Sequence, residues 1–189
     1  MSKLQKLVEG FSPVTYSRVQ RGDVSYKETY ELTVSELERL VKMYKSLQQV
    51  GQTARLIRDS IDHWIRRYHG YAIEGSIGSH YTEVGVDRAN CVFEHVIPAA
   101  KVRDMLLQGV LTVEQALNTP TCLISKRNDE ILREQGHVSS SPDYWNFFKR
   151  YNVFDDAKFV TYNGQSINDV DVWTLDDHYR FFNIESNEQ

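Results

Sequence analysis

Two adjacent residues, Glu94 and His95, carry side chains that can do chemistry, and they stand where such side chains are unusual. They lie within the run Cys91 to Ile97, whose other members are apolar. A strand of this kind is normally filled by residues that need no polar partner. At least one of these two side chains therefore needs a hydrogen-bonding or ionic partner. A carboxylate beside an imidazole, with the amide of Asn128 approaching from a helix, can hold one hard divalent cation and leave a neutral histidine as a base.

The pattern between residues 91 and 136 predicts the elements that position these side chains. Pro98 ends the first strand, Thr112 with Gln115 forms a helical capping box, and Ser125 opens the last helix. In order, the segment predicts a strand over 91–97, helices at about 99–108 and 112–117, a strand over 121–124, and a helix from Ser125 that stops at Gly136. The order is therefore strand, helical insertion, strand, helix.

The N-terminal part predicts two helices. Residues 11–32 are polar and irregular, and Thr33 with Glu36 forms a capping box, so we expect a first helix over about 34–48. After Gly51 an apolar stripe at helical spacing predicts a second helix, and its members are Ile57, Ile61, Trp64, Ile65 and Tyr68. Two such helices predict an antiparallel hairpin, and the glycine-containing residues 70–90 predict a loop.

The C-terminal part is rich in aromatic residues. Ser141 and Pro142 predict the start of a helix, Asn163-Gly164 predicts a type I′ hairpin turn, and Thr174 caps a last short helix. The helix after Pro142 would carry the aromatic residues Tyr144, Trp145, Phe147, Phe148 and Tyr151. Their helical spacing favours core packing over stacking on nucleic-acid bases.

Composition and charge limit the class of protein. Hydrophobic residues make up 41% and charged residues 25% of the 189 residues, close to the averages of globular proteins, so we expect one compact folded unit. A net charge of −4 and a pI near 5.9 argue against binding of nucleic acid through a broadly basic surface. Positive charge for such a partner must be local or supplied by a metal ion.

The spacing of the cysteines and the length of the apolar runs indicate the cellular compartment. Cys91 and Cys122 lack a Cys-x-x-Cys spacing, so neither a structural zinc site nor a disulfide framework is predicted. The apolar runs are short, and Met1 to Gly10 lacks the apolar stretch of a signal peptide. We therefore expect a cytoplasmic protein with no membrane partner.

Two short motifs resemble the HNH (ββα-metal) nuclease family. Phe93-Glu94-His95-Val96-Ile97-Pro98 is similar to the family's first strand, in which an acidic residue precedes the catalytic histidine. Asn118, followed by Leu123 to Asn128, is similar to the family's central asparagine and closing helix. The spacing from Asn118 to Asn128 is typical of the family, whereas His95 and Asn118 are 23 positions apart, which indicates a helical insertion.

The resemblance implies a mechanism. His95 would remove a proton from water, which then attacks the scissile phosphorus. Glu94 and Asn128 would hold one Mg²⁺ or Mn²⁺, and Asn118 would fix the histidine ring or its loop. Asn118 precedes Thr119-Pro120, so the end of a helix is the alternative role for this residue. Because adjacent strand residues face opposite sides, Glu94 and His95 share a site only if the strand is strongly twisted or ends there.

The implied partner is nucleic acid, with DNA favoured over RNA. Lys126 and Arg127 are candidates for holding phosphate or ordinary solvated helix residues, and Arg88 and Arg103 are weaker candidates. His80, near Glu83, is a further candidate for the site. The small size would suit a phage or mobile-element enzyme acting in a host cytoplasm. A ribonuclease with the same site, or a catalytically inactive HNH-like binding protein, is the alternative, and the sequence does not give an oligomeric state.

The resulting fold prediction is α+β. We expect an N-terminal helical region over residues 1–75, a ββα-metal core with a helical insertion over 76–140, and a small aromatic-rich cap over 141–189 packed on that core. A ββα unit is too small to be stable by itself, and no zinc-binding cysteine pairs brace this one. The two flanking regions must therefore supply the packing.

Overall fold

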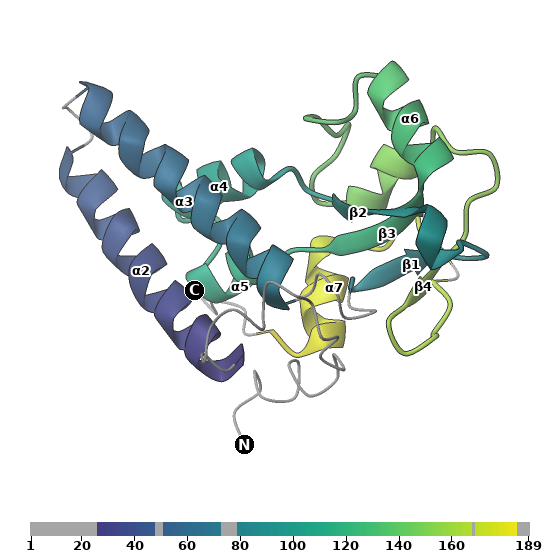
Figure 1. Ribbon diagram of the computed structural model, residues 1–189, viewed down its shortest axis with the longest axis horizontal. Helices are drawn as coiled ribbons and strands as arrows, with labels where there is room; N and C mark the ends of the chain where they lie inside the picture. Colours follow the sequence, from purple (N-terminus) through teal and green to yellow (C-terminus); the bar gives the residue numbers. More distant parts are fainter. Residues whose placement is uncertain (1–25, 48–50, 73–78, 168, 185–189) are drawn as a thin grey trace.

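The computed structural model describes residues 26–47, 51–72, 79–167 and 169–184. Helices α2 (Tyr26–Leu47) and α3 (Gly51–Ala72) lie side by side and antiparallel at one end of the molecule (Figure 1). At the other end are the sheet and its helices. The α+β class, with an N-terminal helical pair and an aromatic cluster, is confirmed. In the described part of the chain, no helix is both long and apolar enough to cross a membrane.

The sheet has four strands in the order β2-β3-β1-β4. Strand β2 (Cys91–His95) pairs antiparallel with β3 (Thr121–Ser125), and β3 pairs parallel with β1 (Tyr81–Glu83). The short strand β4 (Phe159–Thr161) then pairs antiparallel with β1. A 3-10 turn, η2 (Arg88–Asn90), leads into β2. The β1 strand thus lies inside the sheet, although the glycine-containing sequence around it predicted a loop.

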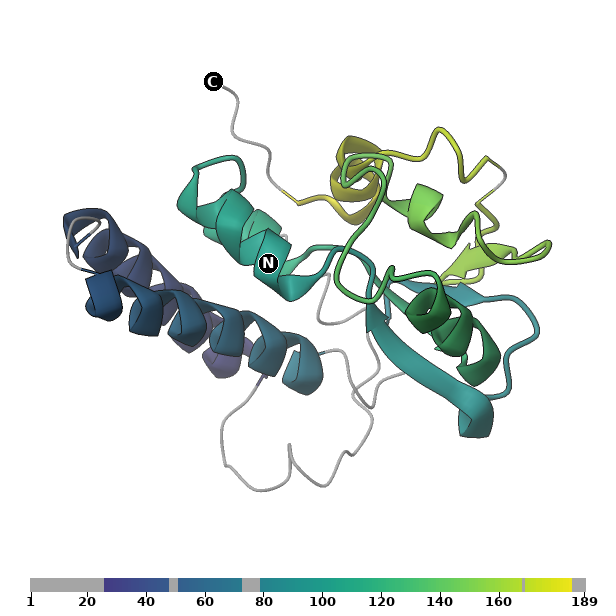
Figure 2. The same cartoon turned by 90° about the horizontal axis from the view of Figure 1, so that it is seen from above.

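Two helices join β2 to β3. Helix α4 (Ala99–Leu107) starts directly after Pro98, and α5 (Val113–Leu117) starts with the predicted Thr112–Gln115 capping box. Both pack against α2 and α3 (Figures 1 and 2). The buried faces of α3 and α4 belong to one hydrophobic core. Ile61 and Ile65 of α3 and Val102 of α4 have no exposed surface in it. The insertion is therefore the part that joins the helical pair to the sheet.

Helix α6 (Lys126–Glu134) follows β3 without a linker. Ser125, the last residue of β3, caps α6 because its hydroxyl accepts from the Asn128 backbone N–H at 3.2 Å. The helix packs back on both β2 and β3. The predicted order of strand, helical insertion, strand and helix is confirmed over residues 91–136.

Two predictions about the N-terminal part are wrong. Helix α2 begins at Tyr26, earlier than the capping box at Thr33, which lies buried within the helix. Tyr30 is buried against Tyr68 of α3, with ring centroids 5.8 Å apart, so tertiary packing makes this irregular sequence helical. Residues 11–25 and 73–78, which we also predicted to be irregular, lie outside the described residues.

Two predictions about the C-terminal part are also wrong. No helix starts at Pro142, because the Asp143 carboxylate accepts from the backbone N–H of Trp145 and Asn146 and makes a turn instead. Of the five aromatic residues, Phe147, Phe148 and Tyr151 lie in a 3-10 helix, η3 (Phe147–Tyr151), with Phe147 and Phe148 fully buried. Asn163 has no positive φ, so its turn is not type I′. The last helix, α7 (Leu175–Phe182), is capped by Thr174 as predicted.

Candidate functional site

Glu94 and His95 are the last two residues of β2. In the antiparallel pairing, Glu94 lies opposite Cys122 and His95 lies opposite Thr121. Successive side chains of a strand point to opposite faces of the sheet. The strand ends at His95, which was one of the two conditions for a shared site, but the contacts of the two side chains diverge.

The Glu94 carboxylate forms an ion pair with Arg150, a fully buried arginine of η3. Arg150 also donates to the carbonyl oxygens of His95, Val96 and Val138, at 2.8, 2.9 and 3.2 Å. Burial raises the pKa of Glu94 above its usual range, and the opposing effect of the guanidinium does not cancel that rise. The charge of this half-buried carboxylate is therefore only partly compensated by Arg150.

Asn128, in the first turn of α6, is hydrogen-bonded to Glu83, a residue that the sequence marked only as a neighbour of His80. Its Nδ2 donates to Oε1 of Glu83, the last residue of β1, at 2.9 Å. Glu83 also accepts from the backbone N–H of Ser125 at 2.8 Å and from its hydroxyl at 3.3 Å. No local pattern marks Glu83, because its partners are more than 40 positions away in the chain.

The two carboxylates and Asn128 lie toward the same part of the sheet. Burial, followed by the charges of Glu83 and Glu94, raises the pKa of the Cys122 thiol well above its usual value. Cys122 stands on β3, between β1 and β2, so a carboxylate flanks it on either side. Asp129 and Arg133 of α6 also act on the pKa of Glu94. Glu83 and Glu94 thus lie on the strands that flank β3, and α6, which carries Asn128, packs on β2 and β3.

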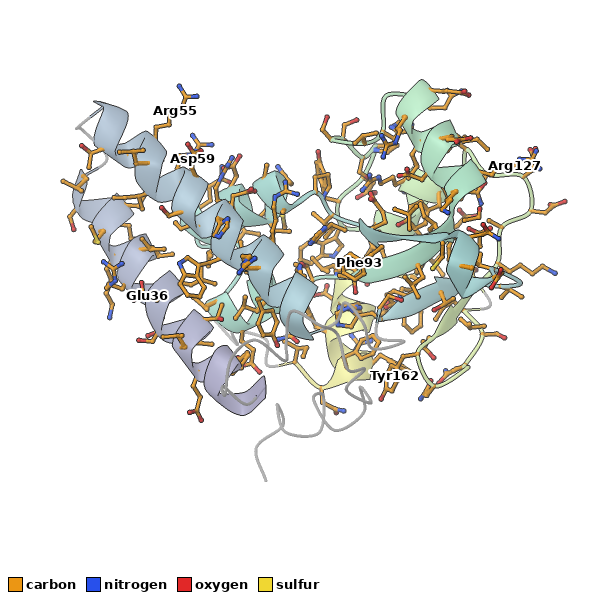
Figure 3. All side chains as sticks on the ribbon, viewed as in Figure 1. Glu36, Arg55, Asp59, Phe93, Arg127 and Tyr162 are labelled. Carbon is orange, nitrogen blue, oxygen red and sulfur yellow. The ribbon has the colours of Figure 1, made fainter. Side chains whose placement is uncertain are left out.

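His95 is turned to a different neighbourhood. Its ring lies 5.0 Å from that of His69 on α3 and 5.4 Å from that of Phe93, measured between centroids. Figure 3 shows Phe93 in the region between α3 and the sheet. The His95 Nε2 atom is buried without a hydrogen-bond partner among the described residues. Burial, with the nearby His69 and Arg66, lowers the pKa of His95 well below 6.5, so the ring is neutral at pH 7.

Asn118 and His80 serve the structure around the site. The Asn118 side chain donates to the Glu114 carbonyl at 2.8 Å and closes the end of α5, one of its two predicted roles. Its own carbonyl accepts from Nε2 of His178 at 2.7 Å. The buried His80 contacts Thr121 through Nδ1 at 2.9 Å. Neither side chain has a described hydrogen bond to His95.

The predicted phosphate-binding residues fall into two groups. Lys126 and Arg127 are exposed at the start of α6, where Arg127 projects into solvent (Figure 3) and the Lys126 ammonium donates to the Ala89 carbonyl at 3.2 Å. Arg103 is mostly buried, and its guanidinium already has an ionic partner in Asp104 at 2.9 Å. The Arg88 side chain lies outside the described part of the structure.

Glu94 and Asn128 carry oxygen atoms of the kind that a hard divalent cation prefers. Arg150 occupies Oε1 of Glu94 and Glu83 occupies Nδ2 of Asn128, while within the described residues no hydrogen bond engages Glu94 Oε2 or Asn128 Oδ1. Mg²⁺ needs only one or two protein carboxylates, because waters and phosphate oxygens complete its shell. No group of three or more His, Cys, Asp or Glu side chains in the described ranges is arranged to hold a metal ion. A cation here would therefore be shared with substrate and solvent.

No family model, no curated protein and no solved structure matches this chain. The resemblance of residues 91–136 to HNH nucleases therefore stays a prediction.

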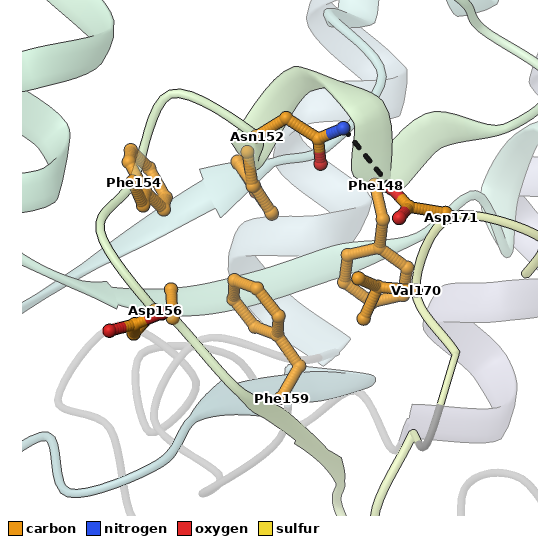
Figure 4. Close-up of a pocket in the computed structure, with 9 residues that line it drawn as sticks. Phe148, Asn152, Phe154, Asp156, Phe159, Val170 and Asp171 are labelled. Atoms are coloured by element: carbon orange, nitrogen blue, oxygen red, sulfur yellow. Dashed lines mark hydrogen bonds between the residues drawn. The ribbon is translucent and has the colours of Figure 1, made fainter.

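An aromatic cavity of about 300 Å³ lies elsewhere, next to η3 and β4 (Figure 4). Phe148, Phe154 and Phe159 contribute to its walls, and Asn152 donates to Asp171 at its edge at 3.1 Å. Its volume is at the lower limit of ordinary ligand pockets. None of the predicted site residues lines it, so it is separate from the candidate site.

Proposed function

We propose that this chain is a metal-dependent endonuclease of the HNH type that hydrolyses phosphodiester bonds in DNA. One observation carries the proposal. The antiparallel strands β2 and β3 are followed without a linker by α6, which packs on both, with Glu94-His95 at the end of the first strand and Asn128 in the first turn of the helix. This is the order of elements and residues that the HNH resemblance implies.

His95 is the general base in this proposal, which therefore requires the scissile phosphate to lie at the end of β2, between the diverging side chains of Glu94 and His95. A base must be neutral to accept a proton, and the lowered pKa of His95 keeps its ring neutral at pH 7. Because Nε2 is enclosed, we assign Nδ1 as the atom that takes the proton from water. A phosphate anion beside the ring raises the pKa of the imidazole and strengthens it as a base.

Glu94 and Asn128 are the proposed ligands of one Mg²⁺ or Mn²⁺, through Oε2 and Oδ1. When bound, the cation would neutralise charge that grows on the phosphate and the departing oxygen. Arg150 holds the Glu94 carboxylate and the carbonyls of the residues that follow it, so it fixes the end of β2. Lys126 and Arg127 are the exposed basic residues nearest to Asn128 in the chain, and we assign them to the phosphate backbone.

Substitution His95→Ala should reduce cleavage at least about a hundredfold, the typical contribution of a general base. Purified protein is incubated with supercoiled plasmid, single-stranded DNA and RNA, in Mg²⁺, Mn²⁺ or chelator. His63→Ala is the matched control, because His63 is an exposed histidine of α3. Cutting that survives the His95 substitution removes this residue from the mechanism, and cutting of RNA alone makes the protein a ribonuclease.

A catalytically inactive HNH-like binding protein is the second candidate, and a specific observation favours it. Glu94 already has a buried cationic partner in Arg150, and the His95 ring is packed against His69 with Nε2 enclosed. Each group that a nuclease would use thus also has a structural role. In the same assay, wild-type protein that cuts none of the three substrates with either metal supports this candidate.

A further inference from the structure

Glu83 is held rigidly at the junction of β3 and α6. Three donors reach its carboxylate, namely the Ser125 N–H at 2.8 Å, the Ser125 hydroxyl at 3.3 Å and Asn128 Nδ2 at 2.9 Å. The same hydroxyl accepts from the Asn128 N–H at 3.2 Å. Among the described residues no Lys or Arg side chain pairs with Glu83. The described partners of this carboxylate are therefore all neutral.

The chemistry of this contact decides which way the Asn128 amide faces. An ionised carboxylate can only accept hydrogen bonds, so the amide must present its NH₂ group to Glu83. The amide nitrogen and oxygen are attached to the same carbon and point in different directions. Oδ1 therefore points away from Glu83 and is the atom left for another ligand. With neutral polar neighbours alone, either end of the amide could face inward.

We propose that Glu83 is a positioning residue, which orients the Asn128 amide so that Oδ1 is the atom offered to a divalent cation. The inference rests on the proposed function, since it concerns a ligand of the proposed metal. Carboxylates that bind the other end of a ligand side chain commonly fix its orientation at metal sites. Glu83 acts from β1, a strand outside the segment that carries the HNH resemblance.

Substitution Glu83→Gln tests this role with little change of shape. The introduced glutamine can present either an oxygen or an NH₂ group, so it no longer dictates the orientation of the Asn128 amide. We expect the Mn²⁺ dissociation constant to rise about 10–100-fold, the usual effect of removing such a partner. Binding is measured on the full chain by electron paramagnetic resonance of free Mn²⁺, without nucleic acid. Glu130→Gln, which removes an exposed carboxylate of α6, controls for the loss of one charge.

A second substitution separates orientation from a general structural effect. Asn128→Asp supplies two equivalent oxygens and needs no orienting partner, so the double variant Glu83→Gln/Asn128→Asp should recover most of the Mn²⁺ affinity. Asn128→Asp alone places two carboxylates together and should be less stable than the double variant. Recovery in the double variant is not expected if Glu83 only stabilises the fold.

The outcomes distinguish this inference from the proposed function. Wild-type protein that neither binds Mn²⁺ nor cuts nucleic acid overturns both. Wild-type protein that binds Mn²⁺ while Glu83→Gln binds it equally well overturns only the role of Glu83. A double variant that binds no better than Glu83→Gln, with both variants folded by circular dichroism, also overturns the positioning role.

Discussion

Replacing Arg150 with methionine should lower the free energy of unfolding by about 3–5 kcal/mol, as expected when one partner of a buried ion pair is removed. The substitution leaves the Glu94 carboxylate without its cation and removes the donors to three backbone carbonyls. For a chain of this length the thermal midpoint should fall by roughly 6–20 °C. Urea unfolding and thermal unfolding by circular dichroism measure the two quantities.

Three further variants test the cause of this loss. Arg180→Met removes an arginine whose side chain is 76% exposed, so it should change stability by less than about 1 kcal/mol. Arg150→Lys keeps the charge but not the planar set of donors, so it should still destabilise the protein. Adding Glu94→Gln to Arg150→Met should recover part of the loss, because a neutral amide needs no counter-ion. An Arg150→Met protein as stable as the wild type would show that Glu94 does not depend on this pair.

Arg150 and Glu83 show why part of the site could not be predicted from the sequence. The sequence predicted that Glu94 needs a partner, since a carboxylate on an apolar strand is rarely left unsatisfied. The partner lies 56 positions away in an aromatic segment, where no periodicity marks one arginine as buried. Two adjacent basic residues, Lys149 and Arg150, stand between Phe148 and Tyr151, and nothing in the sequence distinguishes the buried one from the other.

The elements around Asn128 were predictable because local interactions specify them. Ser125 and Thr112 cap α6 and α5 through their own hydroxyls, and Pro98 has the fixed φ that suits the start of α4. In contrast, β1 has only three residues and depends on its pairing with β3 and β4. The glycine-containing sequence around β1 predicted a loop, because the partners that make this segment a strand lie far away in the chain.

The insertion between β2 and β3 explains how the central segment is stabilised. Helices α4 and α5 pack on α2 and α3, and on the other side η3 places Arg150 under β2. A bare unit of two strands and a helix buries too little apolar surface to fold alone. The helical pair and the aromatic segment supply that surface here. The residue that ends β2, His95, is consequently in contact with both parts, through the His69 ring and through Arg150.

Acid should begin to destabilise this protein below about pH 6.5, before its carboxylates titrate. His69 and His178 have no exposed surface, and burial lowers the pKa of His69 to about 4 and that of His178 to about 3. Burial lowers the pKa of His80 and His95 as well. In the unfolded chain these groups take up protons near pH 6.5, so below that pH the unfolded state binds more protons than the folded state. The free energy of unfolding is therefore highest above about pH 6.5 and decreases as the pH falls toward 4.

The expected slope is large because several groups act together. Each histidine that is protonated only in the unfolded state contributes about 1.4 kcal/mol per pH unit, so His69 and His178 alone give about 3 kcal/mol per pH unit between roughly pH 5.5 and 4. The raised pKa of Glu94 has the opposite sign, because its folded form binds a proton first, but it is a single group. Urea unfolding at pH 7.5, 6.0 and 5.0 measures the slope. His178→Gln should reduce it, whereas His63→Gln, on the exposed face of α3, should leave it unchanged. Equal stability at pH 7.5 and 5.0 would mean that these histidines already titrate in the folded state, and the enclosed, neutral His95 of the proposed mechanism would then have to be abandoned.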